Sequence, residues 1–275
     1  MLAVDRQKKI LQILNETDVV KVTELARRFS VTEETIRRDL ARLEDARTLT
    51  RIHGGAIPIK INEHEQPISE REVNNQEIKF RLAEAAIALL QPGDTIGMDA
   101  STTVIQIAKS MPNESHLILT FSILAQIALK DREAITVIST GGRLLPSSMS
   151  YAGPMAESAL EQFRVDKFFF SCQGLSIARG ISETNEMQAR MKLKMSSIAE
   201  KSILILDQSK LDQDGFALIG PISIIDTVII NGPVPQEYRQ MFADQNIEVI
   251  EVPVDVSVKT PEGKIGNGDP VTVPL

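Results

Sequence analysis

The sequence is short of the residues that mark several classes of protein. Cys172 is its single cysteine, which excludes an intrachain disulfide and a cysteine-built zinc site. Apolar runs such as 203–206 and 227–230 are far shorter than the roughly 18 residues of a membrane-spanning helix. The N-terminus becomes polar at Asp5, so no secretory signal is expected. These absences predict a cytoplasmic protein with no metal site, no cofactor and no membrane partner.

What remains is typical of a soluble globular chain, with 43% hydrophobic and 24% charged residues. A length of 275 residues fits one large or two modest domains. Residues 1–57 hold 11 Lys and Arg against 9 Asp and Glu, whereas the remainder holds 19 against 28. This asymmetry favours a small module that tolerates phosphate, joined to a larger acidic one.

The first 57 residues show helical periodicity followed by strand-like pieces. Apolar residues recur every three or four positions in three stretches, which begin at Ile10, Val22 and Ile36. Residues 49–57 then form two short strand-like pieces around a basic tip that contains glycine. Three helices followed by a hairpin predict a winged helix-turn-helix domain over residues 1–57.

The third stretch carries arginine on the face opposite its apolar stripe. With Ile36 and Leu40 turned inward, Arg38 falls on the outer face, and Thr32 is a suitable N-cap. Arginine can read guanine and can also pair with phosphate. A solvated amphipathic helix is the alternative reading of the same pattern. If the helix binds DNA, the expected contacts are Thr32, Glu34, Thr35, Arg37 and Arg38, with Arg51 and His53 at the wing.

From residue 73 to residue 252 strands alternate with helices, after a polar linker over 58–72. This alternation predicts an α/β domain with a mostly parallel sheet covered on both faces. The expected strands are 95–98, 117–120, 136–139, 167–172, 202–206, 227–230 and 248–252. The expected helices are 78–90, 103–110, 123–130, 154–162, 184–200 and 235–244. Residues 253–275 are expected to form a loosely attached tail.

Polar loops follow the first three of these strands. Such loops meet at the carboxyl edge of a parallel sheet, where open α/β sheets bind ligands. The first loop runs into a helix, whose free N–H groups favour an anion. Ordinary helix caps would explain the same hydroxyl residues. The expected ligand contacts in these loops are Asp99, Ser101, Thr102, Thr103, Thr120, Ser122, Gly141 and Gly142.

Longer motifs resemble the DeoR family of bacterial transcription regulators. The N-terminal part of the resemblance is Arg6-x3-Ile10-x3-Leu14, then Thr32-x2-Thr35-Ile36-Arg37-Arg38-Asp39-Leu40 and His53-Gly54-Gly55-Ala56. It implies a DNA-binding role. Asp39 would repel phosphate, so we expect it to pair with an arginine or to support helix packing.

The resemblance continues through the family's sensor domain, which is related in fold to ribose-5-phosphate isomerase and binds phosphorylated sugars. Asp207-Gln208-Ser209-Lys210 resembles the family's D-x-S-K stretch, which adds Lys210 to the expected effector contacts. Lys192 matches another recurrent lysine, although Gln188 stands where its partner is often acidic. Ala100-Ser101 and Phe121 also depart from the family's D-x-G-T-T and T-N-S loops.

Residues 99–103 and 170–174 look most like the subgroup that regulates rhamnose or fucose use, whose effectors are expected to be rhamnulose or fuculose 1-phosphate. Phe121 would then contact the sugar's methyl group, or would simply pack in the core. The resemblance implies a homodimer or homotetramer on double-stranded operator DNA. It also implies a repressor of a carbohydrate operon that a sugar phosphate releases, with activation as the alternative.

Two other functions fit parts of the chain. A sugar-phosphate enzyme would need a carboxylate base, but Ser171-Cys172-Gln173-Gly174 offers none, so no catalytic residue is expected. Cys172 has no evident histidine partner that would activate it as a nucleophile, so we expect it to be a small buried residue. An architectural DNA-binding protein would leave Ser101–Thr103 and Lys210 unexplained.

Overall fold

The computed structural model divides the chain into two compact units, residues 1–63 and 64–275. It describes residues 3–17, 19–45, 49–52, 54–58 and 66–253. Within these ranges every helix is too short or too polar to cross a lipid bilayer.

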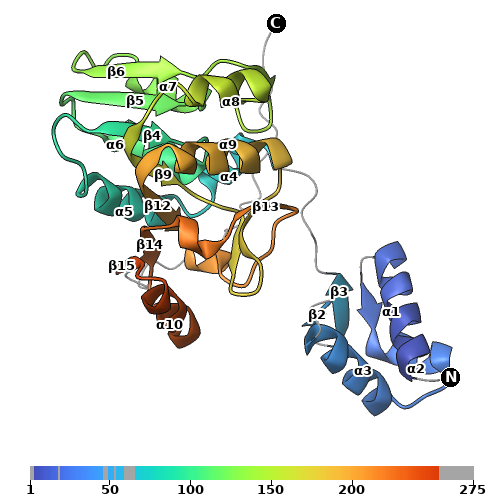
Figure 1. Cartoon of the computed structure of the whole chain (residues 1–275). Coiled ribbons are helices and arrows are strands. Elements are labelled where there is room, and N and C mark those ends of the chain that lie inside the picture. The colour runs from blue at the N-terminus through green and yellow to red at the C-terminus, as the bar shows by residue number, and fades with distance from the viewer. Residues whose placement is uncertain (1–2, 18, 46–48, 53, 59–65, 254–275) are drawn as a thin grey trace, which may run out of the picture. The chain divides into compact units, whose positions relative to one another are not determined.

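The N-terminal unit packs helices against a small antiparallel sheet (Figure 1). Its helices are α1 (Ala3–Thr17), α2 (Val22–Phe29) and α3 (Glu33–Asp45). Its strands are β1 (Val20–Lys21), β2 (Leu49–Ile52) and β3 (Gly55–Pro58), in the order β1-β3-β2. The winged helix is therefore confirmed. The two-residue strand β1 was not predicted, because so short a segment shows no periodicity.

The apolar stripes of the three helices form the core of this unit. Ile10 and Leu14 of α1 and Ile36 and Leu40 of α3 are almost fully buried, together with Leu49 of the wing. Spacing of three and four residues places these side chains on one face of each helix, as expected. Because the core uses those faces, the opposite face of α3 is left to solvent.

The second unit contains a seven-stranded sheet in the order β15-β14-β12-β9-β4-β5-β6, in which all pairs are parallel. Each of its strands overlaps one predicted from the sequence: β4 (Thr95–Met98), β5 (His116–Thr120), β6 (Ile135–Ser139), β9 (Val165–Phe170), β12 (Ala199–Leu206), β14 (Thr227–Asn231) and β15 (Glu248–Val252). The expected α/β fold is therefore confirmed.

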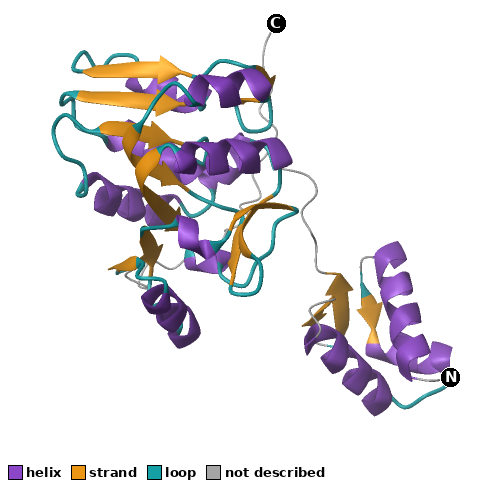
Figure 2. Ribbon diagram, in the orientation of Figure 1, coloured by secondary structure: helices purple, strands orange, loops and turns teal. Residues whose placement is uncertain are grey.

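Helices cover both faces of this sheet (Figure 2). One face packs against α5 (Gln76–Ile87), α6 (Thr102–Ser110) and α7 (Ile123–Leu129). The other packs against α8 (Pro154–Leu160), α9 (Glu186–Ser197) and α10 (Gln236–Asp244). Side chains of β9 alternate between the two cores: the stacked rings of Phe168 and Phe170 face one, and Phe169 faces the other.

Short antiparallel elements complete the second unit. They are the hairpin β7 (Arg143–Leu145) and β8 (Ser150–Ala152), and a sheet of β10 (Gly174–Ser176), β11 (Gly180–Glu183) and β13 (Ala217–Gly220). Two 3-10 turns, η1 (Gln208–Lys210) and η2 (Ile222–Ile224), follow β12 and β13. The sequence prediction missed these strands, because three or four residues are too few to show alternation.

The expected linker over 58–72 needs correction at both ends. Pro58 belongs to β3, and helix α4 (Ile68–Val73) forms before the point where the second domain was expected to start. Ile68 is buried, and its N–H donates to Ser147 O at 2.8 Å, so α4 packs on the second unit. Residues 59–65 and nearly all of the expected tail, 254–275, lie outside the described ranges.

Candidate functional site

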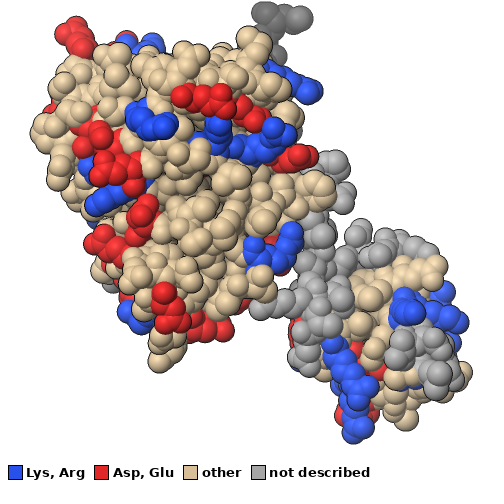
Figure 3. Space-filling model, viewed as in Figure 1, with Lys and Arg blue, Asp and Glu red and all other residues tan. Residues whose placement is uncertain are grey.

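The outer face of α3 presents arginine side chains to solvent. Arg37 Nη2 donates to Glu33 Oε2 at 2.8 Å, and Arg38 Nε donates to Glu34 Oε1 at 3.3 Å. Both pairs are exposed, and such pairs contribute little stability, so an incoming phosphate can displace the glutamates at small cost. Figure 3 shows Lys and Arg side chains prominent on the visible face of the N-terminal unit.

The turn that leads into α3 has the expected geometry. Ser30 ends α2 in the left-handed conformation, with φ of 53°. Thr35 N–H donates to Thr32 Oγ1 at 3.2 Å, which caps the first turn of α3. The predicted cap at Thr32 is confirmed.

Asp39 lies on the buried side of α3. Arg6 Nε donates to Asp39 Oδ2 at 2.5 Å, and Gln7 Nε2 donates to Asp39 Oδ1 at 3.1 Å. The prediction that Asp39 pairs with an arginine is confirmed. This ion pair joins α1 to α3 and fixes the orientation of the helix that carries Arg37 and Arg38.

The wing is held against the end of α3. Arg51 N–H donates to Glu44 Oε1 at 2.9 Å, and Arg51 Nε donates to Glu44 Oε2 at 2.5 Å. These hydrogen bonds lower the pKa of the Glu44 carboxyl below its usual value. The Arg51 side chain is exposed to solvent. His53, the other wing residue expected to contact DNA, lies outside the described ranges.

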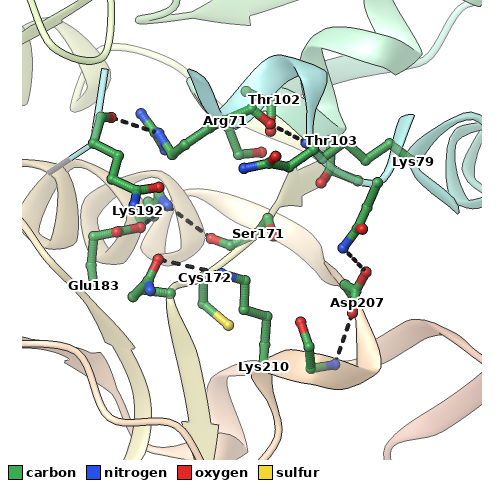
Figure 4. A pocket seen from close by; sticks show the side chains of 16 residues that line it. Arg71, Lys79, Thr102, Thr103, Ser171, Cys172, Glu183, Lys192, Asp207 and Lys210 are labelled. Atoms are coloured by element: carbon green, nitrogen blue, oxygen red, sulfur yellow. Dashed lines mark hydrogen bonds and ion pairs between the residues drawn. The ribbon is translucent and has the colours of Figure 1, made fainter. Parts of the chain in front are cut away.

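A cavity of about 330 Å³ opens beyond the carboxyl ends of β4, β9 and β12 in the second unit (Figure 4). These strands are neighbours in the sheet, so the loops that follow them converge. The lining residues are Gln66, Arg71, Asn74, Asn75, Lys79, Ser101, Thr102, Thr103, Ser171, Cys172, Gln173, Glu183, Lys192, Asp207, Ser209 and Lys210.

The loop from β4 to α6 forms one wall of the cavity. Ser101 caps α6 by accepting a hydrogen bond from Val104 N–H at 3.2 Å. Asp99 Oδ1 in turn accepts from Ser101 N–H at 2.9 Å and from Ser101 Oγ at 2.6 Å. The backbone N–H groups of Thr102 and Thr103 belong to the first helical turn, which has no carbonyl partner within the helix. This wall therefore offers hydrogen-bond donors and the positive end of a helix dipole.

The cavity floor is a buried ion cluster around Lys192. Its Nζ donates to Ser171 O at 2.8 Å and forms ion pairs with Glu183 and with Asp99, the latter at 3.2 Å. Burial disfavours the charged forms, but the opposite charges outweigh it: the pKa of Lys192 is raised and that of Glu183 is lowered. Glu183 supplies the acidic partner of this lysine, which the sequence lacks at Gln188.

The cavity rim is rich in positive charge. Lys210 Nζ donates to Gln173 Oε1 at 3.4 Å, and Lys79 Nζ donates to the backbone carbonyl of Arg71. Burial, together with the charges of Lys210 and Arg71, lowers the pKa of Lys79 to about 8. Positively charged side chains around an open cavity repel one another, and a bound anion reduces that repulsion.

The structure does not bring the loops after β5 and β6 to the cavity. Thr120 Oγ1 donates to Met98 O at 2.8 Å, and Ser122 caps α7. The β7–β8 hairpin closes over them, since Tyr151 N–H donates to the carbonyl of Phe121 at 2.8 Å. Phe121 is fully buried in the core, which is the second of its two expected roles.

Gly141 and Gly142 also lie outside the cavity lining. Both have positive φ, of 59° and 111°. A Cβ on Gly142 would come within 2.9 Å of Ala152 O and of Ala156 Cβ. Packing against β8 and α8 therefore accounts for the glycine at position 142 without any ligand.

Sequence reasoning missed several residues of the cavity. Arg71 and Asn75 fall in or next to the expected linker, and Lys79 falls on a helix that no motif singled out. Asn75 Nδ2 donates to Asp207 Oδ2 at 2.9 Å across 132 residues of sequence. The sequence does place a basic residue on each of two consecutive helices, but this pattern is only a weak indication of a ligand site.

The expectation that no carboxylate lies within reach needs correction, because Glu183 and Asp207 line the cavity. Glu183 is held ionised by Lys192, and a low pKa makes a carboxylate a weak base. Burial raises the pKa of the Cys172 thiol to about 12, so it is an inert buried residue, as predicted. Within the described ranges no cluster of His, Cys, Asp and Glu could hold a metal ion.

A helix-turn-helix unit with arginines on the exposed face of α3, and a charged cavity at a sheet edge in the other unit, are the two parts typical of a ligand-responsive transcription regulator. Residues 6–62 match the DeoR-like helix-turn-helix domain, and residues 74–232 match the DeoR C terminal sensor domain. The chain belongs to the DeoR family. It is a sugar-responsive transcriptional regulator and not an enzyme.

Two relatives align along nearly their whole length. The uncharacterized HTH-type transcriptional regulator YulB of Bacillus subtilis is 41% identical over 92% of this chain and 98% of its own. The L-fucose operon activator of Haemophilus influenzae is 30% identical over 89% of this chain and 98% of its own. The solved structure of ribose 5-phosphate isomerase A from Methanocaldococcus jannaschii matches 51% of this chain and 56% of its own, with 16% identity and a TM-score of 0.39.

Proposed function

We propose that the chain represses a carbohydrate operon by binding operator DNA through α3 and the wing, and that a phosphorylated sugar in the cavity releases it. The observation that carries the effector assignment is the charge of the cavity. Arg71, Lys79, Lys192 and Lys210 line it against Glu183 and Asp207. With Asp99, which pairs with Lys192 at the cavity floor, also counted, one positive charge is in excess, and this excess favours an anionic ligand.

The phosphate group would sit against the first turn of α6. The N–H groups of Thr102 and Thr103, with their hydroxyls, would donate to its oxygens, as helix N-termini do for anions. Lys210 and Lys79 would add two point charges. Each has a single, neutral hydrogen-bond acceptor among the described residues, an amide oxygen of Gln173 or of the Arg71 backbone.

Asp99 and Lys192 have a different role in this proposal. Three acceptors already surround Lys192 Nζ, which has three N–H donors in total. We therefore assign Lys192 and Asp99 to holding Ser101 and Ser171 in place, with the sugar lying above them. Ser101, Thr102, Thr103 and Lys210 remain the direct contacts expected from the sequence.

A 6-deoxyketose 1-phosphate, rhamnulose or fuculose 1-phosphate, is the effector that we propose. Its support is the resemblance of residues 99–103 and 170–174 to the deoxysugar subgroup, and the name of the fucose relative. Phe121 does not contribute, because its ring is fully buried. The same relative is an activator, which makes effector-dependent activation the second candidate function.

On the DNA side, we propose that Arg38, Arg37 and Thr35 contact base edges and phosphates in the major groove, and that Arg51 contacts the backbone beside it. Thr32 and Glu34 hold the helix start and Arg38 in the free protein. One such unit makes a small interface, so a homodimer or homotetramer on paired half-sites supplies the affinity and specificity.

A DNA-shift titration on the promoter beside the chain's own gene tests the proposal, with and without rhamnulose, fuculose and fructose 1-phosphates. We expect specific binding that one of the three selectively alters. Arg38→Ala should abolish the shift and keep effector binding, whereas Lys210→Gln should keep the shift and weaken effector binding. Specific DNA binding that no sugar phosphate alters would contradict the effector assignment. Absence of specific binding would contradict the α3 assignment.

A further inference from the structure

Helix α4 joins the effector cavity to the part of the chain that leads to the DNA-binding unit. It starts at Ile68, and the DeoR-like helix-turn-helix match ends at residue 62. Gln66, Arg71 and Asn74, from α4 and its flanks, line the cavity. The wall nearest in sequence to the DNA-binding unit is therefore also a wall of the ligand site.

Among the described residues, helix α4 buries little side-chain surface against the rest of the second unit. Ile68 is its single buried residue, and an isolated helix of six residues is not stable in water. Besides the Ile68 N–H bond to Ser147, an ion pair joins Glu72 to Lys109 of α6, and Lys79 donates to the carbonyl of Arg71. Segments with so little buried surface lie at the low end of local stability. A further contact from a bound ligand would change that stability by a large fraction.

Arg71 is the residue of α4 that can make such a contact. Its Nε donates to Gln66 O at 3.0 Å, which ties the N-terminal flank of α4 to the same side chain. Its charge also adds to the effects of burial and Lys210 that lower the pKa of Lys79, and to that of Lys192, which lowers the pKa of Glu183. In Figure 4 Arg71 lies along the upper edge of the cavity with its guanidinium directed at the Gln66 carbonyl, and Lys210 extends from the lower edge.

We propose that Arg71 binds the anionic group of the effector and is the residue through which occupancy of the cavity acts on α4 and on the chain leading to the DNA-binding unit. This inference rests on the proposed function. A ligand shifts a protein between two states only through interactions that differ between them. Direct contact with α4, which has a single buried residue, supplies that difference, whereas contacts with α6 and η1 supply affinity alone.

The distinguishing measurement is operator affinity at saturating effector. The probe is whichever of rhamnulose, fuculose and fructose 1-phosphate alters the wild-type shift. Arg71→Gln should weaken effector affinity about tenfold, as for loss of a charge-assisted hydrogen bond. Even at saturation, Arg71→Gln should lose most of the effector-induced change in operator affinity. Lys210→Gln should recover the full change once saturated.

Two controls separate folding and charge from coupling. Arg71→Lys keeps the positive charge but lacks the guanidinium group that can bind Gln66 and the ligand at the same time. It should retain part of the effector-induced change in operator affinity. Arg81→Gln removes an arginine of α5 that pairs with Glu77 and Glu84 and does not line the cavity, and it should behave as wild type.

Full recovery of the operator response by saturated Arg71→Gln would overturn the inference, as would unchanged effector affinity in that variant. A wild-type chain that binds none of the three compounds would instead contradict the proposed function itself. Amide exchange over residues 66–75 supplies a second readout. Saturating effector should slow it in the wild type but not in Arg71→Gln, and unchanged exchange in the wild type would also overturn the inference.

Discussion

Arg6 and Asp39 form a buried ion pair across the N-terminal unit, with 2.5 Å between Nε and Oδ2 and both side chains less than a tenth exposed. Removal of one partner breaks this buried ion pair. Asp39→Asn should therefore lower the free energy of unfolding of this unit by about 3 kcal/mol, measured by urea denaturation followed by circular dichroism.

The double variant Arg6→Met with Asp39→Leu serves as its control. It removes both charges and should be less destabilised than either single variant, since well-packed apolar residues often replace buried ion pairs without loss. Equal stability of Asp39→Asn and the wild type would show that the pair does not hold α1 to α3.

Operator binding should depend steeply on salt, and each phosphate-contacting arginine should contribute to that slope. Loss of one such contact lowers the slope of log affinity against log salt by about 1. We expect Arg51→Gln to have this effect with little change in sequence preference. Arg164→Gln, in the second unit, is the matched control. A slope that Arg51→Gln leaves unchanged would remove the wing from the interface.

Effector binding should take up protons near pH 8. Burial and the neighbouring charges of Lys210 and Arg71 lower the pKa of Lys79 to about 8, and a bound phosphate dianion would raise it again. Because the charged lysine binds the anion, affinity should fall as the pH rises through 8. Calorimetry in two buffers of different ionisation enthalpy measures the uptake. Lys79→Met should weaken binding at neutral pH and abolish the uptake, and uptake that persists would assign it to another group.

Lys192→Met should affect stability before it affects ligand recognition. The variant leaves Glu183 and Asp99 buried side by side without their cation. We expect a loss of about 3–5 kcal/mol in the free energy of unfolding, read from the urea midpoint of the second unit. A variant with wild-type stability and lost effector affinity would instead place Lys192 among the direct ligand contacts.

Cys172 should resist alkylation in the native chain. Burial raises the pKa of its thiol to about 12, so almost no thiolate is present at pH 8. Iodoacetamide should react at the rate of unfolding, and urea should accelerate the reaction sharply. Fast modification of the folded chain at pH 8 would show that the floor of the cavity opens without unfolding.

Periodicity and local motifs predicted the parts of this protein that depend on neighbouring residues. The stripes of α1 and α3, the cap at Thr32 and the loop from Asp99 to Thr103 are all local in sequence. The central strands of the parallel sheet were predicted because a strand buried on both faces is largely apolar, and the partly exposed edge strands β6 and β15 were predicted from their shorter apolar segments.

The rest of the site depends on tertiary placement. Glu183 reaches Lys192 because β11 folds back beside α9, and Arg71 reaches the cavity because Ile68 anchors α4. The polar residues Thr120 and Ser122 matched the pattern of a ligand loop, but the β7–β8 hairpin covers the end of β5. No spacing rule predicts which of several loops at one sheet edge is covered.

The ion cluster of Lys192, Asp99 and Glu183 allows the residues around the cavity to vary during evolution. The cluster holds strand ends and loops together by contacts within the protein, and the proposed contacts Arg71, Lys79 and Lys210 lie on other elements at the rim. Substitutions at the rim can therefore change which sugar phosphate is preferred without loss of fold stability. The same sensor fold can therefore come to recognise different sugar phosphates while the ion cluster stays unchanged.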